Sequence, residues 1–227
     1  MKRTIIVLVG LLLFTSCNNK PTKKGNLIIK GQVKGLRLGN LIIKKIVKDS
    51  LIPIDSIKVD GNEKFKFISN IDQAQILLLQ LPEIKDGRIT FFASPNDTIQ
   101  IFTFLESFGI SPKIKGGNNQ LKRNEYQQMI KKFNEKELDL FKEKFDATKL
   151  HQVAKADSLS NAINRFRRKR VLYALNFVFT NKNKAIAPYV AMMEFYNNPK
   201  ALDTIYKILP KNLQQSIYGK EIKKLLK

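Results

Sequence analysis

The spacing of apolar residues changes once along the chain, and this change limits the folds that the chain can adopt. Seven short runs rich in β-branched and aromatic residues come first, at 27–33, 40–47, 52–59, 63–68, 75–81, 88–93 and 98–104. Runs of this kind are typical of β-strands. After Gly116-Gly117-Asn118-Asn119 the apolar residues recur about every three and a half positions, as in amphipathic helices. The sequence therefore predicts an α+β chain, with an N-terminal antiparallel β-sandwich followed by a C-terminal helical region.

Turn sequences separate the predicted strands. Asp60-Gly61-Asn62 lies between the alternating segments 57–59 and 65–67 and predicts a β-hairpin, because glycine supplies the positive φ of a tight turn. Lys85-Asp86-Gly87 and Pro95-Asn96-Asp97 predict two further turns. Turns at this spacing indicate a sandwich of about seven or eight strands.

Two apolar stripes in the second half predict surfaces on which helices pack. The stripes consist of Tyr126, Met129, Ile130, Phe133, Leu140, Phe141 and Phe145, and of Ala156, Leu159, Ile163, Phe166, Tyr173 and Phe177. The segment 146–152 predicts a turn between two antiparallel helices, and one long bent helix is the alternative. Asn198-Pro199 predicts a capped helix that runs to Leu209, and a last helix is expected from about Lys211 with a break at Gly219.

The N-terminus has the three parts of a secretory signal. Lys2 and Arg3 are positively charged, Ile5 to Phe14 is apolar, and Thr15 and Ser16 are small. The apolar part is shorter than the roughly 20 residues that a membrane-spanning helix requires. We expect a signal peptide over 1–16.

The five residues Leu13-Phe14-Thr15-Ser16-Cys17 resemble the lipobox of bacterial lipoproteins, although Phe14 stands where leucine is usual. The resemblance implies that Cys17 carries a diacylglycerol, and two acyl chains form a firm anchor. We therefore expect a protein of the cell envelope, anchored to a membrane that faces the periplasm, with the outer membrane favoured. The alternative is a cleaved signal followed by an incidental cysteine. The expected organisation is a tether over 17–26, a β-sandwich domain over 27–117 and a helical domain over 118–227.

The counts of cysteine and histidine restrict the chemistry that the chain can perform. The single cysteine cannot form an intramolecular disulfide, a Cys-x-x-Cys motif or a zinc site with several cysteines. The single histidine, His151, lies near a predicted helix boundary and is interpreted as a surface or capping residue. The aspartates 55, 60, 97 and 157 lack the spacing of a calcium loop. We expect no cofactor, no metal and no catalytic site.

One predicted helical segment has the densest run of positive charge. The chain has a formal net charge of +22, and Arg165-Phe166-Arg167-Arg168-Lys169-Arg170 contributes the densest run. Phe166 is expected to face the neighbouring helix. Arg167, Arg168 and Arg170 are candidate contacts for phosphate or carboxylate groups, and an ordinary solvated helix face is the alternative. Because a secreted protein meets lipid head groups and wall polymers, we do not expect nucleic acid as a partner.

Several segments resemble, in order, a domain of unknown function that forms the N-terminal part of Bacteroidetes-type thiol:disulfide interchange lipoproteins. They are Gly31-Gln32-Val33, Leu41-Ile42-Ile43, Ile54-Asp55-Ser56, 60–67, 95–99, 114–117 with Asn119, Asp157-Ser158-Leu159, 187–191 and 216–220. In that family a thioredoxin-like domain follows, whereas this sequence ends at Lys227. The resemblance therefore does not imply redox activity here.

These observations favour a non-catalytic lipoprotein that acts as an interaction or accessory module in the envelope, with a separately encoded redox or envelope protein as the expected partner. One alternative is the front half of a split or truncated thiol:disulfide oxidoreductase. Another is a protein that binds wall polymer or lipid through the basic helix.

Overall fold

The strands form two four-stranded sheets in a computed structural model, which describes residues 24–47 and 50–226. The predicted signal peptide, Cys17 and most of the tether lie outside these residues. One sheet has the order β4-β1-β7-β8 and the other β3-β2-β5-β6. The strands are β1 (Leu27–Lys34), β2 (Leu38–Val47), β3 (Ser50–Asp60), β4 (Lys64–Ser69), β5 (Gln75–Gln80), β6 (Arg88–Ala93), β7 (Thr98–Phe104) and β8 (Lys113–Lys115). The seven predicted strands are confirmed to within two residues at each end, and β8 is added.

The two sheets face each other across an apolar core. Alternate residues of each strand point inward, as the two-residue period requires, and they include Leu27 and Ile29 of β1, Leu41 of β2 and Ile99 of β7. One pair departs from the antiparallel expectation, because β1 and β7 run parallel with Ile29 opposite Ile99.

The predicted hairpin at Asp60-Gly61-Asn62 is wrong. β4 pairs with β1 and β3 pairs with β2, so the turn carries the chain from one sheet to the other. Gly61 does have the positive φ that was expected, at 74°. An alternating pattern determines which face of a strand is buried. Strands of both sheets bury one face in the shared core, so the pattern does not identify the strand with which each one pairs. The turn at 85–87, in contrast, joins the antiparallel pair β5 and β6.

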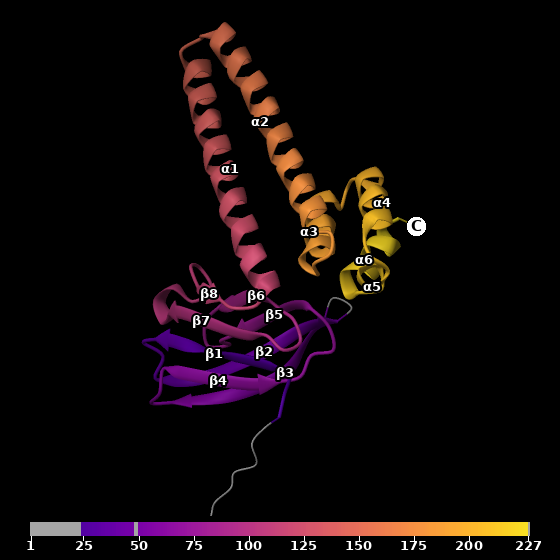
Figure 1. Ribbon diagram of the computed structural model, residues 1–227. Helices are drawn as coiled ribbons and strands as arrows, with labels where there is room; N and C mark the ends of the chain where they lie inside the picture. Colours follow the sequence, from indigo (N-terminus) through magenta and orange to yellow (C-terminus); the bar gives the residue numbers. More distant parts are fainter. Residues whose placement is uncertain (1–23, 48–49, 227) are drawn as a thin grey trace, which may run out of the picture.

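Two long helices form an arm that rises from the sandwich (Figure 1). They are α1 (Asn118–Lys149) and α2 (Val153–Thr180). The short turn between them confirms two antiparallel helices and excludes the alternative of one long bent helix. With 32 residues at about 1.5 Å each, α1 is roughly 48 Å long. We call α1, α2 and their connecting turn the helical arm.

Four shorter helices follow the arm. They are α3 (Ile186–Phe195), α4 (Pro199–Ile208), α5 (Lys211–Gln214) and α6 (Ile217–Leu225). The predicted cap is confirmed, since Asn198 Oδ1 accepts a hydrogen bond from Ala201 N at 3.1 Å. The break expected at Gly219 lies instead at Gln215–Ser216, and Ser216 caps α6 by accepting from Gly219 N. Gly219 is required by packing, because a Cβ there would overlap the carbonyl oxygen of Leu213.

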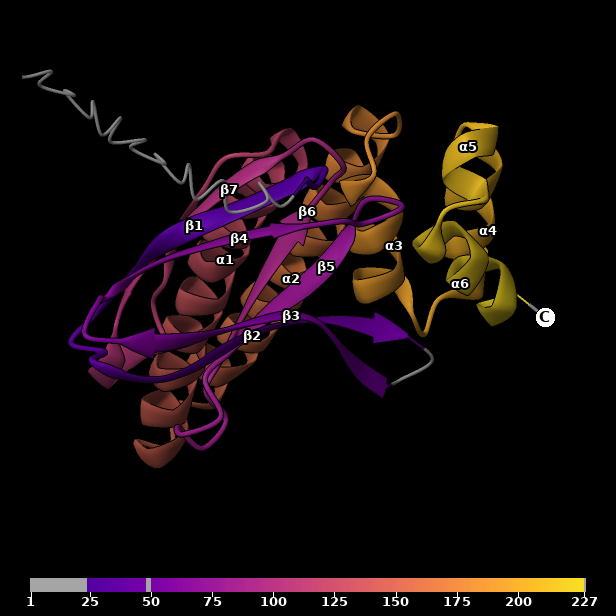
Figure 2. The same ribbon diagram turned by 90° about the horizontal axis from the view of Figure 1, so that it is seen from below.

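A second apolar core joins the helices to the sandwich. Ile76 of β5 and Phe92 of β6 point away from the sandwich interior and pack among Val178 of α2, Ala187 of α3 and Leu202 of α4. Viewed from below, the arm lies behind the sheets and α4–α6 lie to one side (Figure 2). Strands β5 and β6 are thus covered on both faces. Within the described part of the chain, no helix is both long and apolar enough to span a bilayer.

Candidate functional site

The first turns of α1 close the free edge of β6, which has no strand on its outer side. Gln120 Oε1 accepts from the backbone N–H of Phe92 at 2.5 Å. Arg123 donates from Nη1 to the carbonyl oxygen of Thr90 and from Nη2 to Thr90 Oγ1, both at 2.9 Å. An unpaired edge strand is a site for unwanted strand pairing, so side chains that occupy its donors and acceptors protect it. These bonds also fix Arg123 at the foot of the arm.

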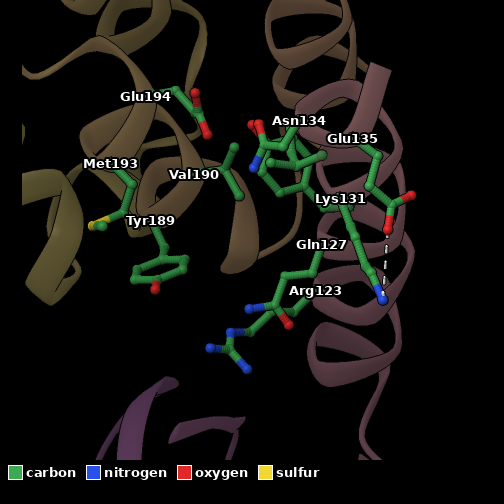
Figure 3. A pocket seen from close by; sticks show the side chains of 11 residues that line it. Arg123, Gln127, Lys131, Asn134, Glu135, Tyr189, Val190, Met193 and Glu194 are labelled. Atoms are coloured by element: carbon green, nitrogen blue, oxygen red, sulfur yellow. Dashed lines mark ion pairs between the residues drawn. The ribbon is translucent and has the colours of Figure 1, made fainter. Parts of the chain in front are cut away.

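A cleft of about 480 Å³ opens above this contact, between α1 and α3 (Figure 3). We call it the α1–α3 cleft. It is lined by Arg123, Tyr126, Gln127, Ile130, Lys131, Asn134, Glu135, Tyr189, Val190, Met193 and Glu194. Ligand sites commonly have volumes of about 300–1,000 Å³ and walls that are mainly apolar. Ile130, Val190, Met193 and the tyrosine rings give the cleft walls of this kind.

Two ion pairs border the cleft. Glu194 of α3 bonds Arg170 of α2, with Oε2 2.9 Å from Nη2 and only 16% of the glutamate side chain exposed. Lys131 and Glu135, one turn apart on α1, form a looser and more exposed pair at 3.8 Å. Each carboxylate that lines the cleft therefore has a cationic partner.

Tyr126 lies at the inner wall and is held by aromatic contacts. Its ring stacks on Tyr173 at 5.9 Å between centroids and lies 4.7 Å from Phe177. Burial raises the pKa of Tyr126, and the neighbouring Glu194 carboxylate raises it further. The hydroxyl therefore stays protonated to higher pH than that of an exposed tyrosine.

The structure separates the three arginines that were predicted to contact anions. Arg167 donates from Nε to Glu137 Oε1 of α1 at 2.6 Å, and its guanidinium lies 5.3 Å from the centre of the Phe141 ring. Arg170 is engaged by Glu194 of α3. Two of the three charges are therefore already paired within the protein.

Arg168 differs from Arg167 and Arg170, which are both paired. It is exposed, and it forms neither an ion pair nor a hydrogen bond with any residue that the structure describes. Phe166 contacts Phe133 of α1 at 5.2 Å between ring centroids, which confirms that it faces the neighbouring helix. Anion contact by the arginine run stays a prediction, and Arg168 is the one of the three predicted residues with no partner among the described residues.

The remaining predicted residues lie apart from the cleft. His151 is exposed in the turn at the tip of the helical arm and has a φ of 53°, which confirms its surface position. Cys17 lies outside the described residues. In segments 24–47 and 50–226, no three His, Cys, Asp or Glu side chains lie close enough together to hold a metal ion.

Sequence reasoning did not identify the cleft, because its walls come from helices about sixty residues apart in the chain. One local signal was available. Arg123 precedes Tyr126 by three residues and Ile130 by seven, so it stands on the apolar stripe of α1. A charged residue in a buried stripe marks a position where the fold has a specific polar partner.

Comparison with known proteins identifies one family. Residues 27–122 match the model of a family described as a domain of unknown function (DUF4369). None of the curated proteins matches the chain. The matched region begins at β1 and ends within the second turn of α1, so it includes both sheets and the Gln120 contact that covers β6. Over residues 27–122 the chain is thus similar to the DUF4369 family of domains of unknown function, which supports the predicted likeness to such a domain for the segments that lie within this region.

Proposed function

We propose that this protein is a non-catalytic lipoprotein of the cell envelope, anchored through Cys17, and that its helical arm binds another envelope protein. The proposal is carried by one observation, the exposed apolar face on the outer half of the arm. Leu138, Phe141 and Phe145 are 54%, 40% and 59% exposed. Their spacing of three and four residues places them on one side of α1. Large apolar side chains grouped on a surface mark contact sites for other molecules.

Further apolar residues extend this face to the tip. Leu150 and Val153, at the two ends of the connecting turn, are 67% and 70% exposed. The outer half of the arm projects away from the sandwich and from α3–α6 (Figure 1). A partner protein can therefore reach this face without displacing any part of the fold.

Cations flank the exposed rings and indicate the chemistry of the partner. Lys149 Nζ lies 4.5 Å from the centre of the Phe145 ring, whereas Arg167, beside Phe141, is already paired with Glu137. An apolar surface with an acidic rim complements this arrangement, since opposite charges at the rim of an interface favour the correct partner. The resemblance to the front part of thiol:disulfide interchange lipoproteins supports a separately encoded thioredoxin-like protein as that partner.

Site-specific photo-crosslinking tests the proposal in cells. A photoreactive phenylalanine analogue is placed at Phe145 of the full-length protein, and the matched control carries it at Phe104, which is 57% exposed on the sandwich. We expect a discrete crosslinked species from position 145 that is absent from position 104, and that is lost when Leu138→Asp is added. The same species from both positions, or none from position 145, would contradict binding by the arm.

The absence of catalysis is tested separately. We expect the purified protein not to reduce insulin disulfides, because a chain with one cysteine has no cysteine pair to oxidise. Reduction that persists in the Cys17→Ser variant would overturn the non-catalytic assignment.

A further inference from the structure

We propose that the α1–α3 cleft binds a small anionic amphiphile, with a carboxylate or phosphate head group on Arg123 and an apolar chain along Ile130 and Met193. This inference does not depend on the proposed function of the helical arm, because it concerns a different surface.

Arg123 has N–H donors that no described residue uses. A guanidinium has five N–H donors. Arg123 spends one from each terminal nitrogen on Thr90, and no other acceptor among the described residues bonds it. Its Nε is buried without a hydrogen-bond partner in the protein, and the residue as a whole is only 6% exposed. Three of its five N–H groups thus have no acceptor among the described residues, in a side chain that lines the cleft.

Arg123 also lacks a counter-charge among the described residues. Each other charged residue of the cleft has a partner, with Lys131 paired to Glu135 and Glu194 paired to Arg170. Arg123 forms no ion pair with any carboxylate in the described part of the chain. A buried charge without a counter-charge is costly, and an anion beside it removes that cost. Arginine also matches carboxylate and phosphate geometry through two parallel hydrogen bonds.

The cleft has an apolar wall above the guanidinium of Arg123. Arg123 lies at the end of the cleft nearest the sheet, while Val190 and Met193 lie farther out along α3 (Figure 3). Met193 is 60% exposed, so part of its apolar surface is open to a ligand. A ligand with one charged end and an alkyl chain would cover Met193 while its head group reaches Arg123.

Calorimetric titration with defined probes tests this inference. The protein used lacks residues 1–17, and every element that the structure describes lies after that point. The probes are decanoate, decyl phosphate, decanol and decyltrimethylammonium, each below its micelle-forming concentration. We expect the two anions to bind at least about tenfold more tightly than the alcohol, because charge-assisted hydrogen bonds contribute more than neutral ones. A preference for decanoate indicates a fatty acid as the ligand, and a preference for decyl phosphate indicates a phospholipid fragment.

A matched pair of variants separates the cleft from the general positive charge of the protein. Gln127→Glu places a carboxylate beside Arg123 without removing any bond that closes the β6 edge, and Gln128→Glu adds the same charge at an exposed position outside the cleft. We expect Gln127→Glu to weaken binding of decanoate about tenfold and Gln128→Glu to change it less than about twofold. Met193→Trp, which narrows the opening of the cleft, should also weaken binding.

Three outcomes would overturn the inference: no binding of either anion, equal binding of decanol and decanoate, or equal effects of Gln127→Glu and Gln128→Glu. None of them bears on crosslinking at Phe145, so failure here is distinguishable from failure of the proposed function.

Discussion

The backbone N–H of Ile76 donates a hydrogen bond of 2.7 Å to the hydroxyl of Tyr218, which lies 142 residues later in the chain. A second bond lies beside it, since Gln73 Oε1 accepts from Ile217 N at 2.9 Å. Together these bonds fix the start of α6 against the β5 end of the sandwich. They show how the helices after the arm are held to a domain that is far away in sequence.

We expect Tyr218→Phe to lower the free energy of unfolding by about 1–2 kcal/mol, because the Ile76 N–H would remain buried without an acceptor. Urea denaturation followed by circular dichroism measures the change. Tyr196→Phe is the control, since Tyr196 is 60% exposed and its variant should stay within about 0.5 kcal/mol of the parent. Equal stability of the two variants would show that the bond contributes nothing.

Alkaline pH should destabilise the protein through its buried tyrosines. Burial raises the pKa of Tyr218 and of Tyr126 above that of an exposed tyrosine. Above about pH 10 these hydroxyls ionise in the unfolded chain and stay protonated in the folded one, so the folded state binds more protons. The stability that they contribute is complete below about pH 10 and is lost as the pH rises toward their folded pKa values.

Urea midpoints measured between about pH 8 and pH 11 test this expectation. The double variant Tyr126→Phe, Tyr218→Phe should have a lower urea midpoint than the parent at about pH 8. Its midpoint should then fall less than that of the parent as the pH rises to about 11. Tyr196→Phe should follow the parent. Parallel curves for parent and double variant would assign the alkaline loss to other groups.

The strands were predictable because their signal is local. A two-residue period with β-branched residues requires only neighbours in sequence, and all seven predicted runs are strands. The pairing of those strands was not predictable in the same way. The turn at Gly61 has the expected conformation, yet it crosses between sheets, because the choice of partner depends on residues far from the turn.

The cleft and its polar contacts also depend on residues that are far apart in the sequence. Arg123 stands on a stripe that could be recognised from sequence, but its acceptor Thr90 and the opposite wall at Val190 come from other elements. For the arginine run, the residues were recognisable from the sequence but their partners were not. Charge density at 165–170 was visible in the sequence, whereas the carboxylates that pair with Arg167 and Arg170 belong to α1 and α3.

We expect Cys17→Ser to leave the precursor uncut or to release the protein from membranes, because a lipid on Cys17 is the anchor that we propose. Fractionation of cells into membrane and soluble parts measures the change, with Ser16→Ala as a control that keeps a small residue at the cleavage side. An unchanged membrane-bound fraction in the Cys17→Ser variant would contradict lipid anchoring.

Arg168 and Arg170 of α2 differ in whether a described residue pairs with them. Arg168 has no ion pair with a described residue, so Arg168→Gln should leave the free energy of unfolding within about 0.5 kcal/mol of the parent. Arg170→Gln leaves Glu194 without its cation at a largely buried position, and should cost about 1–2 kcal/mol, less than a fully buried pair because Arg170 is 30% exposed.

Binding to vesicles that contain anionic lipid should show the opposite order. An exposed cation near such a surface contributes about 1 kcal/mol, so Arg168→Gln should weaken vesicle binding about fivefold, and added salt should mimic the change. Equal vesicle binding by the parent and Arg168→Gln at low salt would show that the arginine run is only a solvated helix face.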